Sequence, residues 1–170
     1  MHEVVRTTGA LQNRPSPLSW PRSPAATITE RLYDALAEAK LMTSRTAMYL
    51  DSASRTRLFR QLDALLDPAE WDDDDAPLRP DSFNTFLKAM LQLMPERPPG
   101  LGLSNAGDLV AAWTSGEDRL TIEFRPEDRV RWVLSRREDG EIERIAGETT
   151  AARLAASLQG HHPAHWFDRG

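Results

Sequence analysis

The 170-residue sequence contains no cysteine, which excludes disulfide bonds, zinc-thiolate sites and thiol nucleophiles together. It also lacks a run of roughly 18 apolar residues, the length that a membrane-spanning helix needs. Residues 1–15 contain no apolar stretch long enough for a secretory signal. We therefore expect a cytoplasmic chain that does not enter a membrane and that performs any chemistry with Asp, Glu, His, Ser or Arg.

The residues that are present are ordinary for a globular chain, with 40% hydrophobic and 28% charged residues. The net charge of -5 is unevenly distributed, because residues 61–100 hold 3 Lys/Arg against 9 Asp/Glu, whereas residues 1–60 hold 9 against 5. This acidic centre suits a protein partner with a basic surface. The basic excess of the first third is too small for us to expect duplex DNA binding by this chain alone.

The length predicts one domain flanked by two unlike ends. Residues 1–26 are rich in proline and serine and lack periodicity, so we expect a disordered arm there. Trp20 is its one large aromatic residue, either tucked into the body or offered to a partner. Residues 27–160 are expected to form a single α+β domain, and residues 161–170 a C-terminal tail.

Helical periodicity covers the first half of the predicted domain. Thr27 and Glu30 form the pattern of a capping box, which predicts that an amphipathic helix of about four turns starts there. A second helix follows and stops at Asp67, before a proline. A third helix opens at Pro80. Its stripe is the strongest in the chain and comprises Phe83, Phe86, Leu87, Met90, Leu91 and Met94.

Beyond residue 100 the apolar period changes from 3.6 to 2, which indicates strands. Short polar turns separate three alternating runs and so predict antiparallel neighbours: Leu109-Ala111-Trp113, Leu120-Ile122-Phe124 and Val130-Trp132-Leu134. Glu141 to Ala146 is expected to be a fourth, edge strand, and a last helix is expected to start at Glu148. The predicted fold is thus α+β, with three N-terminal helices, an antiparallel meander of about four strands and a C-terminal helix.

Four consecutive aspartates, Asp72 to Asp75, follow Trp71 and allow three interpretations. A divalent metal would favour such carboxylates, and Asp72 and Asp74 share a side of an extended chain, but the spacing does not match a calcium-binding loop. A solvated turn is the plainest interpretation. A partner-binding turn is the third, with Trp71 supplying apolar area and Asp72, Asp73, Asp74 and Asp75 supplying a negative rim.

Other candidate sites are weaker. His161, His162 and His165 cluster near the C-terminus and could ligate zinc, but a proline interrupts them, so we expect surface or packing roles, with Trp166 and Phe167 folded back onto the body. Gly100 to Gly107 lacks the lysine and the following helix of a phosphate loop. We therefore predict no catalytic residue and no cofactor.

The stretch from Leu58 to Phe124 is similar to a loosely defined group of small bacterial proteins. Their pattern is leucines at helical spacing, a W-D-G-x-G-A-x-P turn between two helices, and then hydrophobic strands. The matching residues here are Leu58, Leu62, Leu65, Trp71, Asp72, Ala76, Pro77, Phe86, Leu87, Pro95, Leu109, Trp113, Leu120, Ile122 and Phe124. Both family glycines are aspartates in this chain, Asp73 and Asp75. Such proteins are companions of a neighbouring gene in mobile or defence-like loci, so the resemblance implies a partner-binding role and supplies no catalytic residues.

These observations lead to three functional hypotheses. The first is a non-enzymatic protein-binding companion, such as an antitoxin, immunity or accessory subunit of a bacterial two-gene module, with contacts at Trp20 and Trp71 to Asp75. The second is a small nucleic-acid-associated regulator. The third is a divalent-metal enzyme that uses Asp72 to Asp75. Val133 and Ile145 fall outside the main alternating sets, so an open sheet edge with leftover apolar positions also favours self-association.

Overall fold

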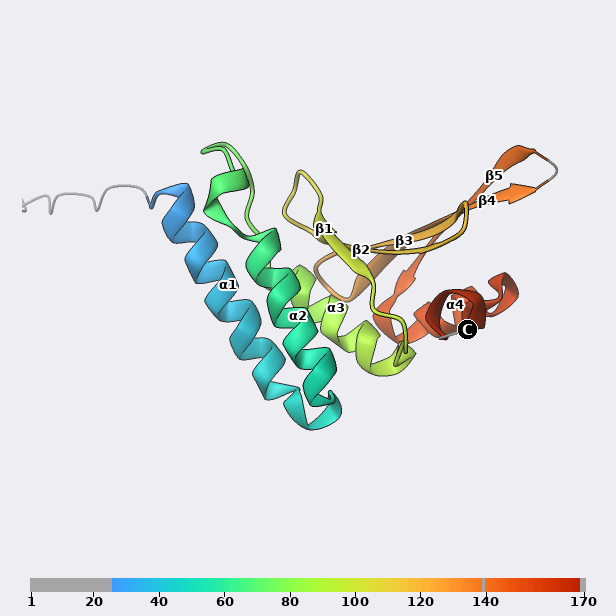
Figure 1. Cartoon of the computed structure of the whole chain (residues 1–170), viewed down its shortest axis with the longest axis horizontal. Helices are drawn as coiled ribbons and strands as arrows, with labels where there is room; N and C mark the ends of the chain where they lie inside the picture. Colours follow the sequence, from blue (N-terminus) through green and yellow to red (C-terminus); the bar gives the residue numbers. More distant parts are fainter. Residues whose placement is uncertain (1–25, 139, 169–170) are drawn as a thin grey trace, which may run out of the picture.

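The computed structural model describes residues 26–138 and 140–168. In this part of the chain, helices come first, an antiparallel sheet follows, and short helices close the fold (Figure 1). The prediction of an α+β fold is confirmed. Trp20 and all but the last residue of the predicted arm lie outside the described residues.

The helices α1 (Ile28–Arg45), α2 (Ser52–Leu65) and α3 (Pro80–Leu93) precede the sheet. The capping box of α1 is present, since the Thr27 hydroxyl accepts from the Glu30 amide at 3.2 Å and the Glu30 carboxylate accepts from the Thr27 amide at 2.8 Å. Pro80 occupies the first turn of α3, where its missing amide hydrogen is not needed. α1 and α2 pack side by side, and α1 also contacts α3 (Figure 1).

The sheet has five strands in sequential order: β1 (Gly100–Leu103), β2 (Leu109–Ser115), β3 (Asp118–Phe124), β4 (Arg129–Glu138) and β5 (Glu141–Thr150). Each strand is antiparallel to the next. The predicted alternation places the apolar residues on one buried face, which is covered by α3, α4 (Leu154–Leu158) and α5 (Pro163–Phe167). The core therefore lies between this face and the helices.

The prediction of about four strands is wrong by one strand. β1 was missed because Gly100 and Gly102 carry no side chain that could show alternation, although their backbones pair with Ala112 and Val110. The expected start of the last helix at Glu148 is also wrong. β5 continues to Thr150 because its last four residues pair with Arg129–Trp132, and α4 begins only after a 3₁₀ turn at Ala151–Arg153.

Ile145 does not point away from the core as expected. It is the register partner of the buried Leu134, and directly paired residues project to the same face of a sheet. Val133, one residue before Leu134, does face the outer side. At the C-terminus, Trp166 is 1% exposed and Phe167 is buried edge-to-face against Trp113, so their predicted return to the body is confirmed.

The first turn of α3 is joined to the sheet by buried hydroxyl groups. The Ser82 hydroxyl accepts from the Leu109 amide at 2.6 Å and donates to the Phe124 carbonyl at 2.6 Å. Leu109 and Phe124 are register partners at the end of the β2–β3 ladder. One turn further along α3, the Thr85 hydroxyl lies 2.7 Å from the Arg125 carbonyl. The helix is thereby fixed to the ends of two strands.

Replacing Ser82 with alanine should lower the free energy of unfolding by about 2 kcal/mol, because two buried backbone groups lose their partner and each such loss costs roughly 1–3 kcal/mol. Urea unfolding followed by circular dichroism measures the change. Ser52→Ala, at an exposed position of α2, is the matched control and should change stability by less than about 0.5 kcal/mol. Equal stability of the two variants would contradict this role for Ser82.

Gly147 permits a close approach within the sheet. It is the register partner of Trp132, and a Cβ atom at Gly147 would lie 2.6 Å from the indole ring. We expect Gly147→Ala to destabilise the fold by roughly 1–3 kcal/mol, since the ring must shift in a packed core. Gly102→Ala, in β1, meets no atom within 4 Å and should be near neutral in the same thermal or urea unfolding measurement. A neutral Gly147→Ala would show that Trp132 moves freely.

Candidate functional site

The predicted aspartate run forms a tight turn, which we call the acidic turn (Trp71–Asp75). It follows a 3₁₀ turn at Pro68–Glu70 that the Asp67 side chain caps. The Asp75 amide donates to the Asp72 carbonyl at 3.1 Å, and the Asp72 amide donates to the Asp75 carboxylate at 2.8 Å. One of the four carboxylates therefore helps to close the turn itself.

The acidic turn is attached to the helices on its N-terminal side. Arg31 of α1 donates to the Asp73 carbonyl at 2.8 Å, and the Trp71 indole donates to the Leu65 carbonyl at 3.1 Å. The Trp71 side chain is half-buried and packs against the core. Much of the apolar surface of Trp71, which was predicted to contact a partner, is thus buried inside the molecule. Asp72, Asp73, Asp74 and Asp75 are all exposed.

The C-terminal side of the acidic turn is attached to the β1–β2 connection. The Arg79 amide donates to the Gly107 carbonyl at 2.9 Å, and the Arg79 guanidinium lies 3.6 Å from the Asp108 carboxylate. Gly107 has φ of 79°, and a Cβ atom there would lie 2.3 Å from the Pro77 carbonyl oxygen, so glycine is required. The backbone of the turn is held from both sides.

Burial raises the pKa of the Asp108 carboxyl above its usual 3.8, and the neighbouring Arg79 opposes this shift only in part. One Asp108 oxygen is buried without a hydrogen-bond partner among the described residues. The raised pKa means that ionised Asp108 opposes folding once the pH exceeds its folded pKa. Asp108 therefore lowers stability at the β1–β2 connection, although it lies beside Arg79.

The carboxylates of the acidic turn are not held in ion pairs. In the described part of the chain, no Lys, Arg or His side chain forms an ion pair with Asp72, Asp73, Asp74 or Asp75. Arg31, which lies at the turn, donates to the Asp73 backbone carbonyl instead. The turn therefore presents concentrated negative charge on a fixed backbone, which attracts a cationic surface.

Among the residues that the structure describes, no group of three or more His, Asp or Glu side chains is arranged so that it could hold a metal ion. Of the three clustered histidines, His161 and His165 contact tryptophan rings, whereas His162 is exposed. The His161 ring lies 5.2 Å from the Trp132 ring, and His165 lies edge-to-face against Trp166, with Nε2 3.7 Å from the Asp118 carboxylate.

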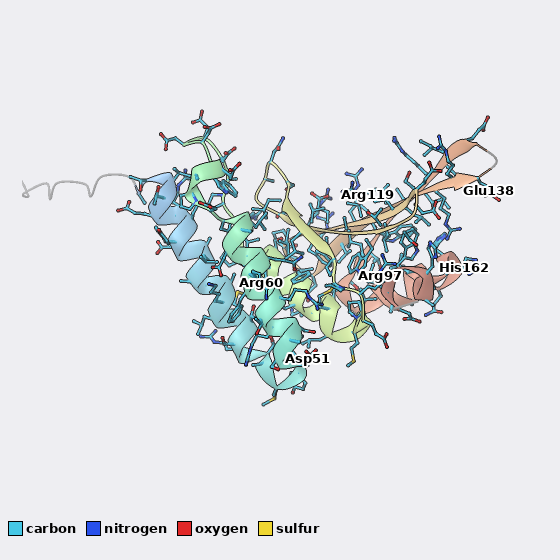
Figure 2. All side chains as sticks on the ribbon, in the orientation of Figure 1. Asp51, Arg60, Arg97, Arg119, Glu138 and His162 are labelled. Atoms are coloured by element: carbon cyan, nitrogen blue, oxygen red, sulfur yellow. The ribbon has the colours of Figure 1, made fainter. Side chains whose placement is uncertain are left out.

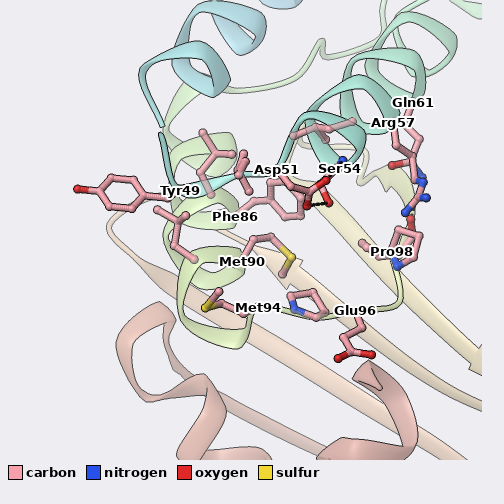
Figure 3. A pocket seen from close by; sticks show the side chains of 16 residues that line it. Tyr49, Asp51, Ser54, Arg57, Gln61, Phe86, Met90, Met94, Glu96 and Pro98 are labelled. Carbon is pink, nitrogen blue, oxygen red and sulfur yellow. Dashed lines mark hydrogen bonds between the residues drawn. The ribbon is translucent and has the colours of Figure 1, made fainter. Parts of the chain in front are cut away.

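A second surface feature is an apolar groove at the other end of α2 (Figure 3). Its floor is formed by α3 side chains, its walls by the start of α2, and its rim by the connection that follows α3. The space measures about 180 Å³. Its lining includes Tyr49, Asp51, Arg57, Phe86, Met90 and Met94.

Two large apolar side chains stand exposed at the rim of this groove. Tyr49 is 66% exposed and Met94 is 75% exposed, whereas Phe86 and Met90 on the floor are buried. Met94 was predicted to continue the buried stripe of α3, and that prediction is wrong. It is the C-cap of α3 in a left-handed conformation, with φ of 43°, so its side chain leaves the helical face.

The carboxylate of Asp51, which lines the groove, has a structural role. The Asp51 carboxylate caps α2 and accepts from both the amide and the hydroxyl of Ser54. These bonds lower the pKa of Asp51 below its usual value. The carboxylate is thus engaged in capping the start of α2 (Figure 3).

No protein-family model, curated protein or solved structure matches this chain. Among the residues that the structure describes, none of the helices has both the length and the apolar character needed to cross a membrane.

Asp108→Asn should stabilise the protein in a pH-dependent manner. The folded pKa of Asp108 is raised, so wild-type stability falls as the pH rises from 3.8 through that value, and the variant escapes this loss. The difference in unfolding free energy, measured by urea titration at several pH values, should therefore grow in favour of Asp108→Asn above pH 3.8. Asp51→Asn should show its pH dependence below pH 3.8 instead, because the pKa of Asp51 is lowered and the wild type loses this contribution to stability only as the pH falls through that lower value. A pH-independent difference for Asp108→Asn would contradict the assignment.

Proposed function

We propose that this protein is a non-enzymatic companion that binds another protein. The observation that carries the proposal is the apolar groove, where two exposed apolar side chains flank a preformed space. Burying such a patch in a partner interface removes apolar area from water, which is the main favourable term in association.

The groove suits one apolar anchor of the partner. Cavities of roughly 150 Å³ hold a benzene-sized group, so a space of about 180 Å³ accommodates one ring or branched aliphatic side chain. Met90 and Met94 adapt their shape to such a group because methionine is unbranched and polarizable. The anchor would be a hot spot, surrounded by Tyr49 and Met94 as a water-excluding rim.

The acidic turn supports a partner with a basic surface. Its four exposed carboxylates have no ion-pair partner in the described residues, so lysines or arginines of the partner would find complementary charge there. The backbone around Asp73 is held by Arg31, so docking would not have to order the turn. The Trp71 side chain is partly buried against the core, so only part of its apolar surface could contact a partner.

The resemblance of Leu58 to Phe124 to small bacterial companion proteins agrees with this proposal. It suggests a partner from a neighbouring gene, so that the chain would be an antitoxin, immunity or accessory subunit. No cofactor is needed for this role. Trp20, outside the described residues, remains a proposed additional contact.

The test is a pull-down of the full chain from its own cells, compared with Tyr49→Ala/Met94→Glu and with Asp73→Asn/Asp74→Asn. We expect a stoichiometric partner whose retention falls about 30-fold in the groove variant, since a hot-spot loss of about 2 kcal/mol has that effect. The turn variant should weaken retention mainly at low salt. Asp34→Asn/Glu38→Gln removes equal charge from exposed positions of α1 and should retain the partner.

Equal retention by wild type and the groove variant would contradict the proposal. Salt-sensitive retention on DNA would favour the regulator instead. A rise in melting temperature with millimolar magnesium or manganese, lost in Asp73→Ala/Asp75→Ala, would favour the metal enzyme.

A further inference from the structure

β5 is a long strand at the edge of the sheet. Its ten residues pair with β4 in continuous register, and within residues 26–138 and 140–168 no strand pairs with its other side. The hairpin of β4 and β5 extends beyond the helices (Figure 1). An edge of this kind presents a row of unpaired amide and carbonyl groups to any strand that can lie beside it.

The opposite edge of the sheet is different. β1 has four residues, and the adjoining Pro99 carbonyl accepts a 2.7 Å hydrogen bond from Gln61 of α2. α2 also contacts β1. Short length and helix contact are features that protect an edge strand. β5 has neither proline nor a bulge, so its edge is open to pairing.

The residues of β5 alternate between the two faces. Ile142, Arg144, Ala146, Glu148 and Thr150 lie on the outer face, which they share with Arg119 of β3, labelled in Figure 2. Arg144, Ala146 and Glu148 are exposed, and Ile142 is 60% exposed. The outer row thus places a positive and a negative side chain symmetrically around Ala146.

This symmetry selects a register for pairing with a second copy of the strand. When two β5 strands lie antiparallel with Ala146 opposite Ala146, Arg144 of each faces Glu148 of the other, and Ile142 of each faces Thr150 of the other. Competing registers differ by two residues, because neighbouring residues project to opposite faces and opposite residues must share a face. A shift by two in one direction places Ile142 opposite Glu148 and Arg144 opposite Ala146, and a shift by two in the other places Arg144 opposite Thr150 and Glu148 opposite Ala146, so both lose the Arg144–Glu148 pairs.

We propose that two copies of this chain pair through their β5 strands in this register and form a continuous antiparallel sheet. The two-fold axis would pass between the two Ala146 residues, as isologous pairing requires. Opposite-charge and β-branched cross-strand pairs each stabilise a sheet, and the register supplies two of each.

The pairing also completes the surroundings of Gly147. On the inner face, Ile145 of one copy would lie opposite Gly147 of the other, beside the Trp132 ring that covers this glycine. Ile145 is already partly buried against the core. The apolar layer of the sheet would therefore continue across the axis.

The proposed dimer is independent of the proposed function. The acidic turn and the apolar groove lie at the two ends of α2, outside the β4–β5 hairpin, so they are not part of the paired edge. A dimer would present both surfaces twice. Binding of a partner and dimer formation can therefore fail separately in experiments.

The experiment measures the mass of the full chain by light scattering after size-exclusion chromatography, over a range of concentrations. Wild type is expected to be a dimer. Arg144→Glu and Glu148→Arg should each raise the apparent dissociation constant by at least about tenfold, because each replaces two opposite-charge pairs with two like-charge pairs. Arg119→Glu, a charge reversal on the same face within β3, should remain dimeric.

Mixing the two single variants provides the sharpest comparison. In the mixed pair, the glutamate introduced at position 144 would face the arginine introduced at position 148. The unchanged Glu148 of the first variant would face the unchanged Arg144 of the second, so a heterodimer should form with an affinity close to that of wild type. Circular dichroism establishes that each variant is folded. This matters because Glu148 also lies 3.5 Å from Arg125 and opposite Arg131.

Three results would overturn the proposal. They are a monomeric wild type at every concentration, single variants that dimerise like wild type, or a mixture that stays monomeric although both variants are folded. A wild type that is monomeric alone, but whose β5 amides become protected from hydrogen exchange when a partner peptide is added, would assign the edge to that partner instead.

Discussion

The hydroxyl of Ser82 is the contact on which the arrangement of helices and sheet depends. It joins the first turn of α3 to Leu109 and Phe124, the paired residues at one end of the β2–β3 ladder. Thr85 adds the Arg125 carbonyl from the next turn. Apolar packing alone allows a helix to slide or rotate on a sheet, whereas buried hydrogen bonds to two strands specify one position.

The position of α3 in turn places both candidate surfaces. Its N-terminus follows Arg79. This residue attaches the segment after the acidic turn to Gly107 and Asp108. The middle and C-terminal part of α3 supply Phe86 and Met90 to the floor of the groove. One helix therefore connects the charged surface with the apolar one, and the sheet to which it is fixed sets the orientation of both.

Local patterns in the sequence predicted the parts of the fold that depend on near neighbours. The capping box of Thr27 and Glu30 marked the start of α1, and the alternation around Trp113 and Trp132 marked the central strands. The exposure of Met94 was missed because its apolar period continues that of α3. Pro95 was the available signal, since a residue before proline avoids the right-handed helical region.

The groove and the strand β1 could not be predicted because neither has a local signature. The groove combines Tyr49, Arg57 and Met94, which are distant in sequence and meet only because residues before and within α2 and residues of and after α3 line one space. β1 is recognised by its hydrogen bonds to β2, since Gly100 and Gly102 have no side chains. The acidic turn was predicted as a surface feature, but the inward role of Trp71 depends on the distant Leu65 carbonyl.

The separation of the two surfaces determines how each would act in binding. α2 has 14 residues and is therefore about 20 Å long, with Tyr49 and Asp51 of the groove before its first residue and the acidic turn beyond its last. Charges are screened over about 8 Å at physiological ionic strength, so the aspartates do not act directly on a group inside the groove. The acidic turn would therefore increase the rate of encounter with a basic partner, and the apolar groove would determine how slowly that partner leaves.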